Sequence, residues 1–185
     1  MKLSVTKRVG TKKSDIKQIR REKNIPAILY SHGKPTEPIM INGDEFAAVL
    51  RKMQSGRLPT TKFSLVEGKK ETQAIVKDIQ YHPTTYQVYH IDFEELQDNV
   101  PVSFKVPIDC TGAAECAGIK LGGFLRQVIR HVKVECLPSK MPEKFEIDVK
   151  DLGIRQSKRL SDLAMPAGVK PLAALSEVVV VIAKR

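Results

Sequence analysis

The sequence predicts a mainly β protein, with a small antiparallel β-barrel and two short helices followed by a second, C-terminal β-rich domain. Short apolar segments recur along the 185 residues and are separated by turn-forming residues. Helical spacing of apolar side chains is found in two segments of the first half, and strict apolar–polar alternation sets in near residue 100. A small barrel closes its sheet and removes the strand edges, which suits many short strands with few helices.

The first elements are a strand and a helix. Leu3–Arg8 is predicted to be a short strand. Ser14 is predicted to cap a helix that runs to about Lys23, because serine supplies an oxygen for the free amides of the first turn. Ile16 and Ile19 form a face of this helix that can dock on the barrel. An adjacent face is a continuous stripe of polar and mostly basic residues: Lys13, Lys17, Arg20, Arg21 and Asn24.

Two strands and a second helix follow. Pro26 opens an apolar strand over residues 25–30, a loop covers residues 31–35, and Glu37–Asn42 is the next strand. A helix is predicted over Asp44–Met53, and Gly56 and Pro59 end it. Its apolar side chains recur at helical spacing, at Phe46, Val49, Leu50 and Met53.

A hairpin and one more strand complete the predicted barrel. Thr61–Val66 and Thr72–Gln80 pair around the turn Glu67-Gly68-Lys69, where glycine permits the reversal of the chain. The strand Tyr86–Phe93 alternates with a period of two residues. Its core face is predicted to carry Tyr89, Ile91 and Phe93, and its outer face Val88, His90 and Asp92.

His90 and Asp92 are therefore expected side by side on an open strand face. Such a pair is typical of a catalytic site, of a metal site, or of a surface that hydrogen-bonds a partner. A fourth interpretation is that the pair caps an arginine within the fold. The spacing of the two residues leaves all four interpretations open.

The pattern changes near Leu96–Asn99, and we predict two domains, residues 1–96 and 97–185. In the second domain apolar and polar residues alternate over residues 100–110, 132–136 and 145–149, and a last strand covers residues 178–182. Pro101 and Pro107 lack an amide donor, so the first of these strands is expected at a sheet edge or with proline on its free side. Gly118, Gly122 and Gly123 mark a flexible turn region.

The cysteines give no support to catalysis. Cys110 and Cys136 share the apolar phase of their strands and are expected in the core, whereas Cys116 lies in a Gly/Ala-rich loop and is expected to be exposed. Nothing near Cys116 would activate its thiol, and no nucleophile or phosphate-loop motif is present. Neither metal-ligand spacing nor a cofactor motif supports a role of His82, His90 and Asp92 in metal binding. A cysteine-dependent hydrolase or transferase remains the enzymatic alternative.

Charge and composition point to a polyanionic partner. The chain carries a net charge of +10, and residues 1–34 hold ten Lys and Arg against two acidic residues, a net +8. Such a field favours polyanions, although a solvated basic surface has the same composition. No apolar run reaches the roughly 18 residues of a membrane span, and the N-terminus is unlike a signal peptide. Three widely spaced cysteines indicate a reduced, cytoplasmic protein.

RNA binding explains both the basic stripe and the acidic residue beside it. Arg and Lys neutralise phosphates, and an aromatic side chain such as Tyr30 packs on a sugar or base. The minor groove of RNA displays guanine amino groups and 2′-hydroxyls, which need an acceptor. Asp92, held by His90, can accept hydrogen bonds from them.

Ordered motifs along nearly the whole chain resemble the bacterial large-subunit ribosomal protein that binds 5S rRNA, in its long two-domain form, the general stress protein CTC family. In the first half these are residues 25–30 (IPAILY), 77–80 (KDIQ), 82–83 (HP) and 90–93 (HIDF). In the second half they are Gly112, Gly122-Gly123, and residues 134–138 (VECLP), 146–149 (EIDV) and 161–163 (SDL). Each motif is weak alone, but the ordered set is specific.

The resemblance implies a non-enzymatic component of the large ribosomal subunit whose N-terminal barrel docks on the minor groove of the loop E region of 5S rRNA. The implied RNA-contacting residues are Arg8, Lys13, Lys17, Arg20, Tyr30, His90 and Asp92. The implied partners are 5S rRNA and neighbouring ribosomal proteins, with no small-molecule substrate and no membrane. Lys17 and Ser31 depart from the arginine and glycine usual in the family, and lysine lacks the planar fork of arginine. The alternative is a stress-responsive RNA-binding protein acting away from the ribosome.

Overall fold

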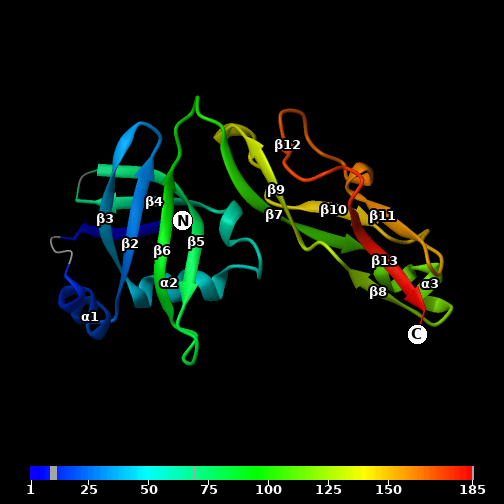
Figure 1. Cartoon of the computed structure of the whole chain (residues 1–185), viewed down its shortest axis with the longest axis horizontal. Coiled ribbons are helices and arrows are strands. Elements are labelled where there is room, and N and C mark those ends of the chain that lie inside the picture. The colour runs from blue at the N-terminus through cyan, green and yellow to red at the C-terminus, as the bar shows by residue number, and fades with distance from the viewer. Residues whose placement is uncertain (9–11, 69, 185) are drawn as a thin grey trace. The chain divides into compact units, whose positions relative to one another are not determined.

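The computed structural model describes residues 1–8, 12–68 and 70–184, so Lys69 of the predicted hairpin turn lies outside the described residues. The chain forms two compact units, Met1–Val100 and Pro101–Arg185. Both units are built mainly of β-strands (Figure 1), which confirms the predicted fold class.

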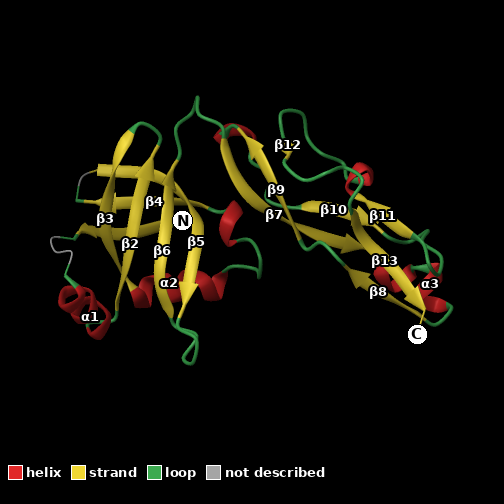
Figure 2. Ribbon diagram, in the orientation of Figure 1, coloured by secondary structure: helices red, strands yellow, loops and turns green. Residues whose placement is uncertain are grey.

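The first unit is a closed six-stranded barrel (Figure 2). In the order of their pairing the strands are β1 (Lys2–Lys7), β3 (Lys34–Asn42), β2 (Asn24–Ser31), β6 (Val88–Glu95), β5 (Lys70–Tyr81) and β4 (Lys62–Glu67). Parallel pairing of β4 with β1 closes the barrel, and β2 also pairs in parallel with β6. Alternate side chains face inward, and Phe46, Phe63 and Phe93 pack with ring centroids 6.5 Å and 6.1 Å apart.

Two helices accompany the barrel, and a short 3₁₀ segment, Leu58–Thr60, precedes β4. Helix α2 (Gly43–Lys52) buries Phe46 completely in the barrel core, and the Asn42 side chain accepts hydrogen bonds from the amides of Asp44 and Glu45. A Cβ atom at Gly43 would collide with the carbonyl oxygen of Lys23, so glycine is required where α2 begins.

Helix α1 (Lys13–Arg21) begins before the predicted cap. The amides of Asp15 and Ile16 donate to the carbonyl of Lys12, so Lys12 is the N-cap, and the Ser14 hydroxyl donates to the Asp15 carboxylate instead. The prediction of a Ser14 cap is therefore wrong. Ile19 is buried as expected, and Lys23, with φ at +60°, turns the chain into β2.

An irregularity in β6 changes the predicted alternation. Gln80 pairs with His90 but Tyr81 pairs with Val88, so Tyr89 is an extra residue with no partner opposite. Such a β-bulge bends the strand and shifts the phase of its side chains. Ile91 and Phe93 are fully buried as predicted, but Tyr89 is 40% exposed and Val88 packs against the core in its place. The prediction that Tyr89 belongs to the core is wrong.

The second unit contains two sheets. The first has the order β10 (Phe145–Asp148), β7 (Val102–Thr111), β9 (His131–Cys136) and β12 (Lys170–Pro171), and the second the order β11 (Ser157–Arg159), β13 (Val178–Lys184) and β8 (Gly123–Gln127). Helix α3 (Ala117–Lys120) and 3₁₀ segments over Ala113–Glu115, Pro138–Lys140 and Leu160–Asp162 connect the strands. Phe145, Ile147 and Val149 are buried, as the alternation predicted.

Strand β7 does not lie at a sheet edge. It pairs with β9 over Val102–Pro107 and with β10 over Ile108–Thr111. The two paired stretches do not overlap, so each part of β7 has one free side. The amide of Ile108 donates to the carbonyl of Arg130, so the nitrogen of Pro107 points away from β9, and the second predicted option, proline on the free side, fits. Gly118 is buried in α3, where a Cβ atom would lie 2.9 Å from Leu152 and Gly153. Glycine is therefore required at this position for close packing, and not for the flexibility that the sequence suggested.

Cys116 is the clearest correction in the second unit. It is fully buried, and its thiol donates to the carbonyl of Leu152 at 3.3 Å, although its Gly/Ala-rich surroundings predicted exposure. Cys136 is buried as predicted, while Cys110 is only partly buried. Burial, followed by the neighbouring Asp109 charge, raises the pKa of the Cys110 thiol. None of the three cysteines forms a disulfide.

Candidate nucleic-acid interface

His90 and Asp92 lie together on the outer face of β6. The Nδ1 atom of His90 is 2.8 Å from Oδ1 of Asp92, and the two side chains are 18% and 35% exposed. An ionised carboxylate can only accept, so Nδ1 of His90 carries the proton in this hydrogen bond. Among the described residues neither lysine nor arginine forms an ion pair with Asp92. The pair therefore presents an anchored carboxylate to solvent and does not cap an arginine.

A row of residues runs across four neighbouring strands to this pair. The amide of Arg8 donates to the carbonyl of Pro38 on β3, Pro38 pairs with Ile28 on β2, and Ile28 pairs with Asp92 on β6. Asp78 on β5 lies opposite Asp92 on the other side. The pairing of β3, β2 and β6 thus places the predicted residue Arg8 in the same row as Asp92, although the two are far apart in the sequence.

Tyr30 belongs to the same face. It pairs with Glu94 on β6, and burial followed by the charges of Glu94, Asp92 and Asp78 raises its pKa to about 12. The phenol therefore stays protonated at neutral pH and can donate a hydrogen bond. Tyr30 and Asp92 consequently offer a donor and an acceptor close together on one rigid sheet.

Lysines neutralise two further acidic residues of β6. The Lys77 amine is 2.7 Å from Glu94, and the Lys34 amine is 3.0 Å from Glu95. Burial would raise the pKa of Glu95, but hydrogen bonds from Ser31 and Lys34 and the Lys34 charge hold it below its usual value. Neither Asp92 nor the exposed Asp78 opposite it has such a cation among the described residues, so both carboxylates remain acceptors on this face, and Asp92 is the one that His90 holds in place.

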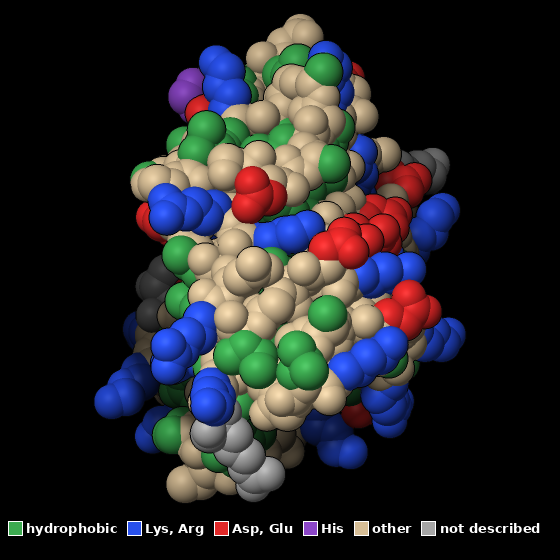
Figure 3. Space-filling model, turned by 90° about the vertical axis from the view of Figure 1, so that its right-hand side faces the viewer, with side chains coloured by type: hydrophobic (Ala, Val, Ile, Leu, Met, Phe, Trp, Pro, Cys, Tyr) green, Lys and Arg blue, Asp and Glu red, His purple; other side chains and the backbone are tan. Residues whose placement is uncertain are grey.

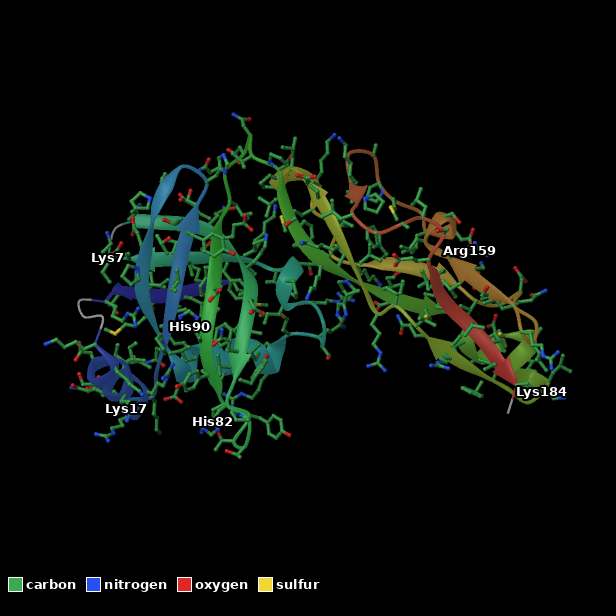
Figure 4. The ribbon with its side chains drawn as sticks, viewed as in Figure 1. Lys7, Lys17, His82, His90, Arg159 and Lys184 are labelled. Carbon is green, nitrogen blue, oxygen red and sulfur yellow. The ribbon has the colours of Figure 1, made fainter. Side chains whose placement is uncertain are left out.

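Helix α1 carries the three other predicted residues beside this sheet. Lys13 and Lys17 are exposed, and Figure 4 shows Lys17 on α1, in the same unit as the strand that carries His90. Arg20 is engaged within the fold. Its guanidinium carbon lies 3.3 Å from the centre of the Tyr89 ring, and Nη2 donates to the carbonyl of Tyr89 at 3.2 Å. Arg20 therefore fixes α1 to β6, while Lys13 and Lys17 remain free to meet phosphates.

Sequence reasoning missed the aromatic side chains at one end of the barrel. Tyr81, Tyr86 and Tyr89 are exposed and fall within nine residues, and they are three of the four tyrosines in the chain. That clustering was the available signal. The assumed regular alternation hid it, because it placed Tyr89 in the core.

Other kinds of site find no support in the described residues. Over 1–8, 12–68 and 70–184, no group of three or more His, Cys, Asp or Glu side chains could hold a metal ion. Within the same residues, none of the helices combines the length and apolar character needed to cross a membrane. On the face of the second unit shown in Figure 3, Lys and Arg are interspersed with Asp and Glu, and apolar side chains are exposed between them.

Comparison with known proteins covers both units. Residues 3–93 match the model of the Ribosomal L25p family, and residues 101–185 match the model of the Ribosomal protein TL5, C-terminal domain. A protein of Chlamydia abortus named "Large ribosomal subunit protein bL25" is 45% identical over 185 residues, which is 100% of both chains. Proteins of the same name from Chlamydia trachomatis serovar L2 and Chlamydia muridarum are each 46% identical over the same full length.

Proposed function

Because this chain belongs to the bL25 family of large-ribosomal-subunit proteins, in the two-domain form with a TL5-type C-terminal domain, we propose that it binds 5S rRNA through its first unit. The family is one of ribosomal proteins and not of enzymes. The proposed surface is the outer face of β2, β6 and β5 together with helix α1. The proposed RNA partner is the loop E region, approached from its minor groove.

The observation that carries this proposal is the anchored carboxylate of Asp92 on a basic protein. An acidic side chain on the binding surface for a polyanion is unfavourable unless it meets hydrogen-bond donors. In RNA, the minor groove supplies such donors as guanine amino groups and 2′-hydroxyls. The 2.8 Å hydrogen bond from His90 fixes the orientation of the carboxylate before RNA arrives. Tyr30 adds a protonated phenol on the same face.

Helix α1 supplies the electrostatic part of the proposed interaction. The exposed Lys13 and Lys17 are one helical turn apart, so both can reach the phosphates of one backbone. Lysine makes point-charge contacts rather than bidentate ones, and Lys17 should therefore contribute affinity more than orientation. Arg8 lies in the same strand row as Asp92. We therefore expect Arg8 to contact a phosphate close to the minor-groove donors that Asp92 meets.

The proposal is tested by identifying the RNA that accompanies the protein. A tagged copy is purified from cells with and without a high-salt wash, and the bound RNA is sequenced alongside sedimentation of the extract. We expect 5S rRNA to be enriched and the protein to sediment with the large subunit. Enrichment of other RNAs from fractions free of ribosomes would contradict the proposal and support a stress-responsive RNA-binding protein instead.

A further inference from the structure

The first unit contains a cavity of about 670 Å³ at the end of the barrel where the β5–β6 turn lies. Three segments surround it: the turn from α1 into β2, the first half of α2, and residues 81–89. Its volume falls within the range of cavities that take small ligands. No residue of the outer-face row around Asp92 lines it, so it is a separate feature of the same unit.

The inner wall of the cavity is apolar and the rim is aromatic. Phe46 is fully buried at the base, and Val88 packs beside it because of the β6 bulge. Tyr81, Tyr86 and Tyr89 are 48%, 78% and 40% exposed and also line the cavity. Exposed aromatic rings around an apolar recess provide stacking surfaces for a flat ring.

The turn that carries these tyrosines is held in one conformation. The amide of His82 donates to the carbonyl of Gln87 at 2.8 Å, and the amide of Tyr86 donates to the carbonyl of His82 at 2.9 Å. Tyr86 adopts a φ of +54°, an uncommon value for a bulky residue, of the kind found where a side chain is presented for function. The turn is thus organised before a ligand binds.

His82 contributes a defined hydrogen-bond donor to the cavity. Its Nδ1 atom lies 3.3 Å from the donating amide of Thr85 and 3.1 Å from the Thr84 hydroxyl. A backbone amide can only donate, so Nδ1 is an acceptor and the neutral ring carries its proton on Nε2. The His82 ring also lies 6.3 Å from Tyr89, which in turn stacks under Arg20.

The charges around the cavity favour a nucleotide over an apolar peptide side chain. Arg20 and Lys23 line it, and the Nε atom of Arg20 is buried without a hydrogen-bond partner among the described residues. A buried donor without an acceptor is costly, and an incoming acceptor relieves that cost. The exposed carboxylate of Asp44 also lines the cavity. It disfavours a phosphate inside and suits the amino group of a base.

We propose that this cavity holds one unpaired base of the bound RNA, stacked on Tyr86 and hydrogen-bonded by polar groups of the wall. The inference rests on the proposed function, since the base belongs to the RNA that the outer face binds. Arg20 connects the outer RNA-binding face with the cavity, because it anchors α1 to β6 and also lines the cavity. The nucleotide lies next to the paired region, with its phosphate outside near Lys23.

The experiment uses the full chain with 5S rRNA and the variants Tyr86→Ala and Tyr86→Phe. Phe124→Ala, which removes a ring that is 48% exposed from the second unit, is the control. Dissociation constants are measured, and the reactivity of each RNA nucleotide toward a base-modifying reagent is probed at saturating protein. Circular dichroism confirms folding, which the high exposure of Tyr86 should preserve.

We expect the parent to protect one unpaired base, and Tyr86→Ala to restore the reactivity of that base while the rest of the footprint persists. Loss of a stacked base should weaken binding by roughly 5- to 150-fold, and Tyr86→Phe and Phe124→Ala should bind like the parent. Unchanged affinity and footprint in Tyr86→Ala would overturn the inference. Normal RNA binding with impaired entry into the large subunit would overturn it in favour of a protein partner. Failure of the parent itself to bind 5S rRNA would instead refute the proposed function.

Discussion

Replacing Asp92 by asparagine tests whether the carboxylate on β6 meets RNA. In the structure Oδ1 of Asp92 is taken by His90 at 2.8 Å, so Oδ2 is the oxygen left for donors in a groove. Asparagine has the same shape but only one acceptor oxygen. If the NH₂ group of asparagine faces the RNA, it meets the donors of the minor groove, and no hydrogen bond can form between them. If the NH₂ group faces His90 instead, Nδ1 of His90 must accept a hydrogen bond, and the ring proton must move to Nε2.

The expected loss follows from these two arrangements. A hydrogen bond to a charged group, or one good contact to a base, contributes about 1–3 kcal/mol. Asp92→Asn should therefore weaken binding of 5S rRNA by roughly 5- to 150-fold. Simple charge repulsion predicts the opposite sign, because removal of a negative charge from a basic surface strengthens binding to a polyanion. The sign of the change thus separates the two explanations.

The assay is a titration of 5S rRNA with the full chain at two salt concentrations, with circular dichroism to confirm folding. Asp98→Asn is the matched control, because it removes one negative charge from an exposed position beyond the end of β6. We expect the Asp92→Asn loss to persist at high salt and Asp98→Asn to bind as tightly as the parent or slightly tighter. If Asp92→Asn binds as tightly as the parent, or tighter, the carboxylate has a structural role only.

Three further outcomes are expected. Lys17→Ala should weaken binding mainly at low salt and reduce the slope of log affinity against log salt by about one contact, roughly 0.7–0.9; an unchanged slope would remove Lys17 from the interface. Glu95→Gln should lower the free energy of unfolding at pH 7 by up to about 1 kcal/mol, since Lys34 is partly exposed. Because folding lowers the pKa of Glu95, this difference in stability should vanish as the pH falls from about 4.3 through the pKa of the folded state, as measured by urea titrations. If the difference persists at low pH, the ionisation of Glu95 is not its cause. A bulky alkylating reagent should label partly exposed Cys110 before buried Cys116 and Cys136, and only slowly because its pKa is raised; fast labelling of Cys116 in native protein, followed by mass spectrometry, would contradict its burial.

The barrel could be predicted from the sequence because its strands obey simple local rules. Phe46 at helical spacing and Phe93 at strand spacing both reach the core as their patterns indicated. The adjacency of His90 and Asp92 also follows from the two-residue period of a strand. The row that adds Arg8 to Asp92 could not be derived, because it depends on which strands pair and in which register.

Failures of the sequence interpretation have identifiable physical causes. The bulge at Tyr89 lies between the pairs Gln80–His90 and Tyr81–Val88, where β6 has one residue more than β5, and only the pairing reveals this. Ser14 is a good cap by type, but the carbonyl of Lys12 already receives the amides of Asp15 and Ile16. The small residues around Cys116 indicated an exposed loop, whereas they permit α3 to pack closely on residues 152–153.

The proposed division of labour places the binding of 5S rRNA in the first unit. Its most direct test compares the dissociation constants of a fragment of residues 1–100 and of the full chain for 5S rRNA, under the same salt conditions and with folding verified by circular dichroism. We expect the two constants to agree within about threefold, a difference of less than about 1 kcal/mol. A folded fragment that binds more than about tenfold more weakly than the full chain would show that the second unit contributes directly, and would contradict the proposal.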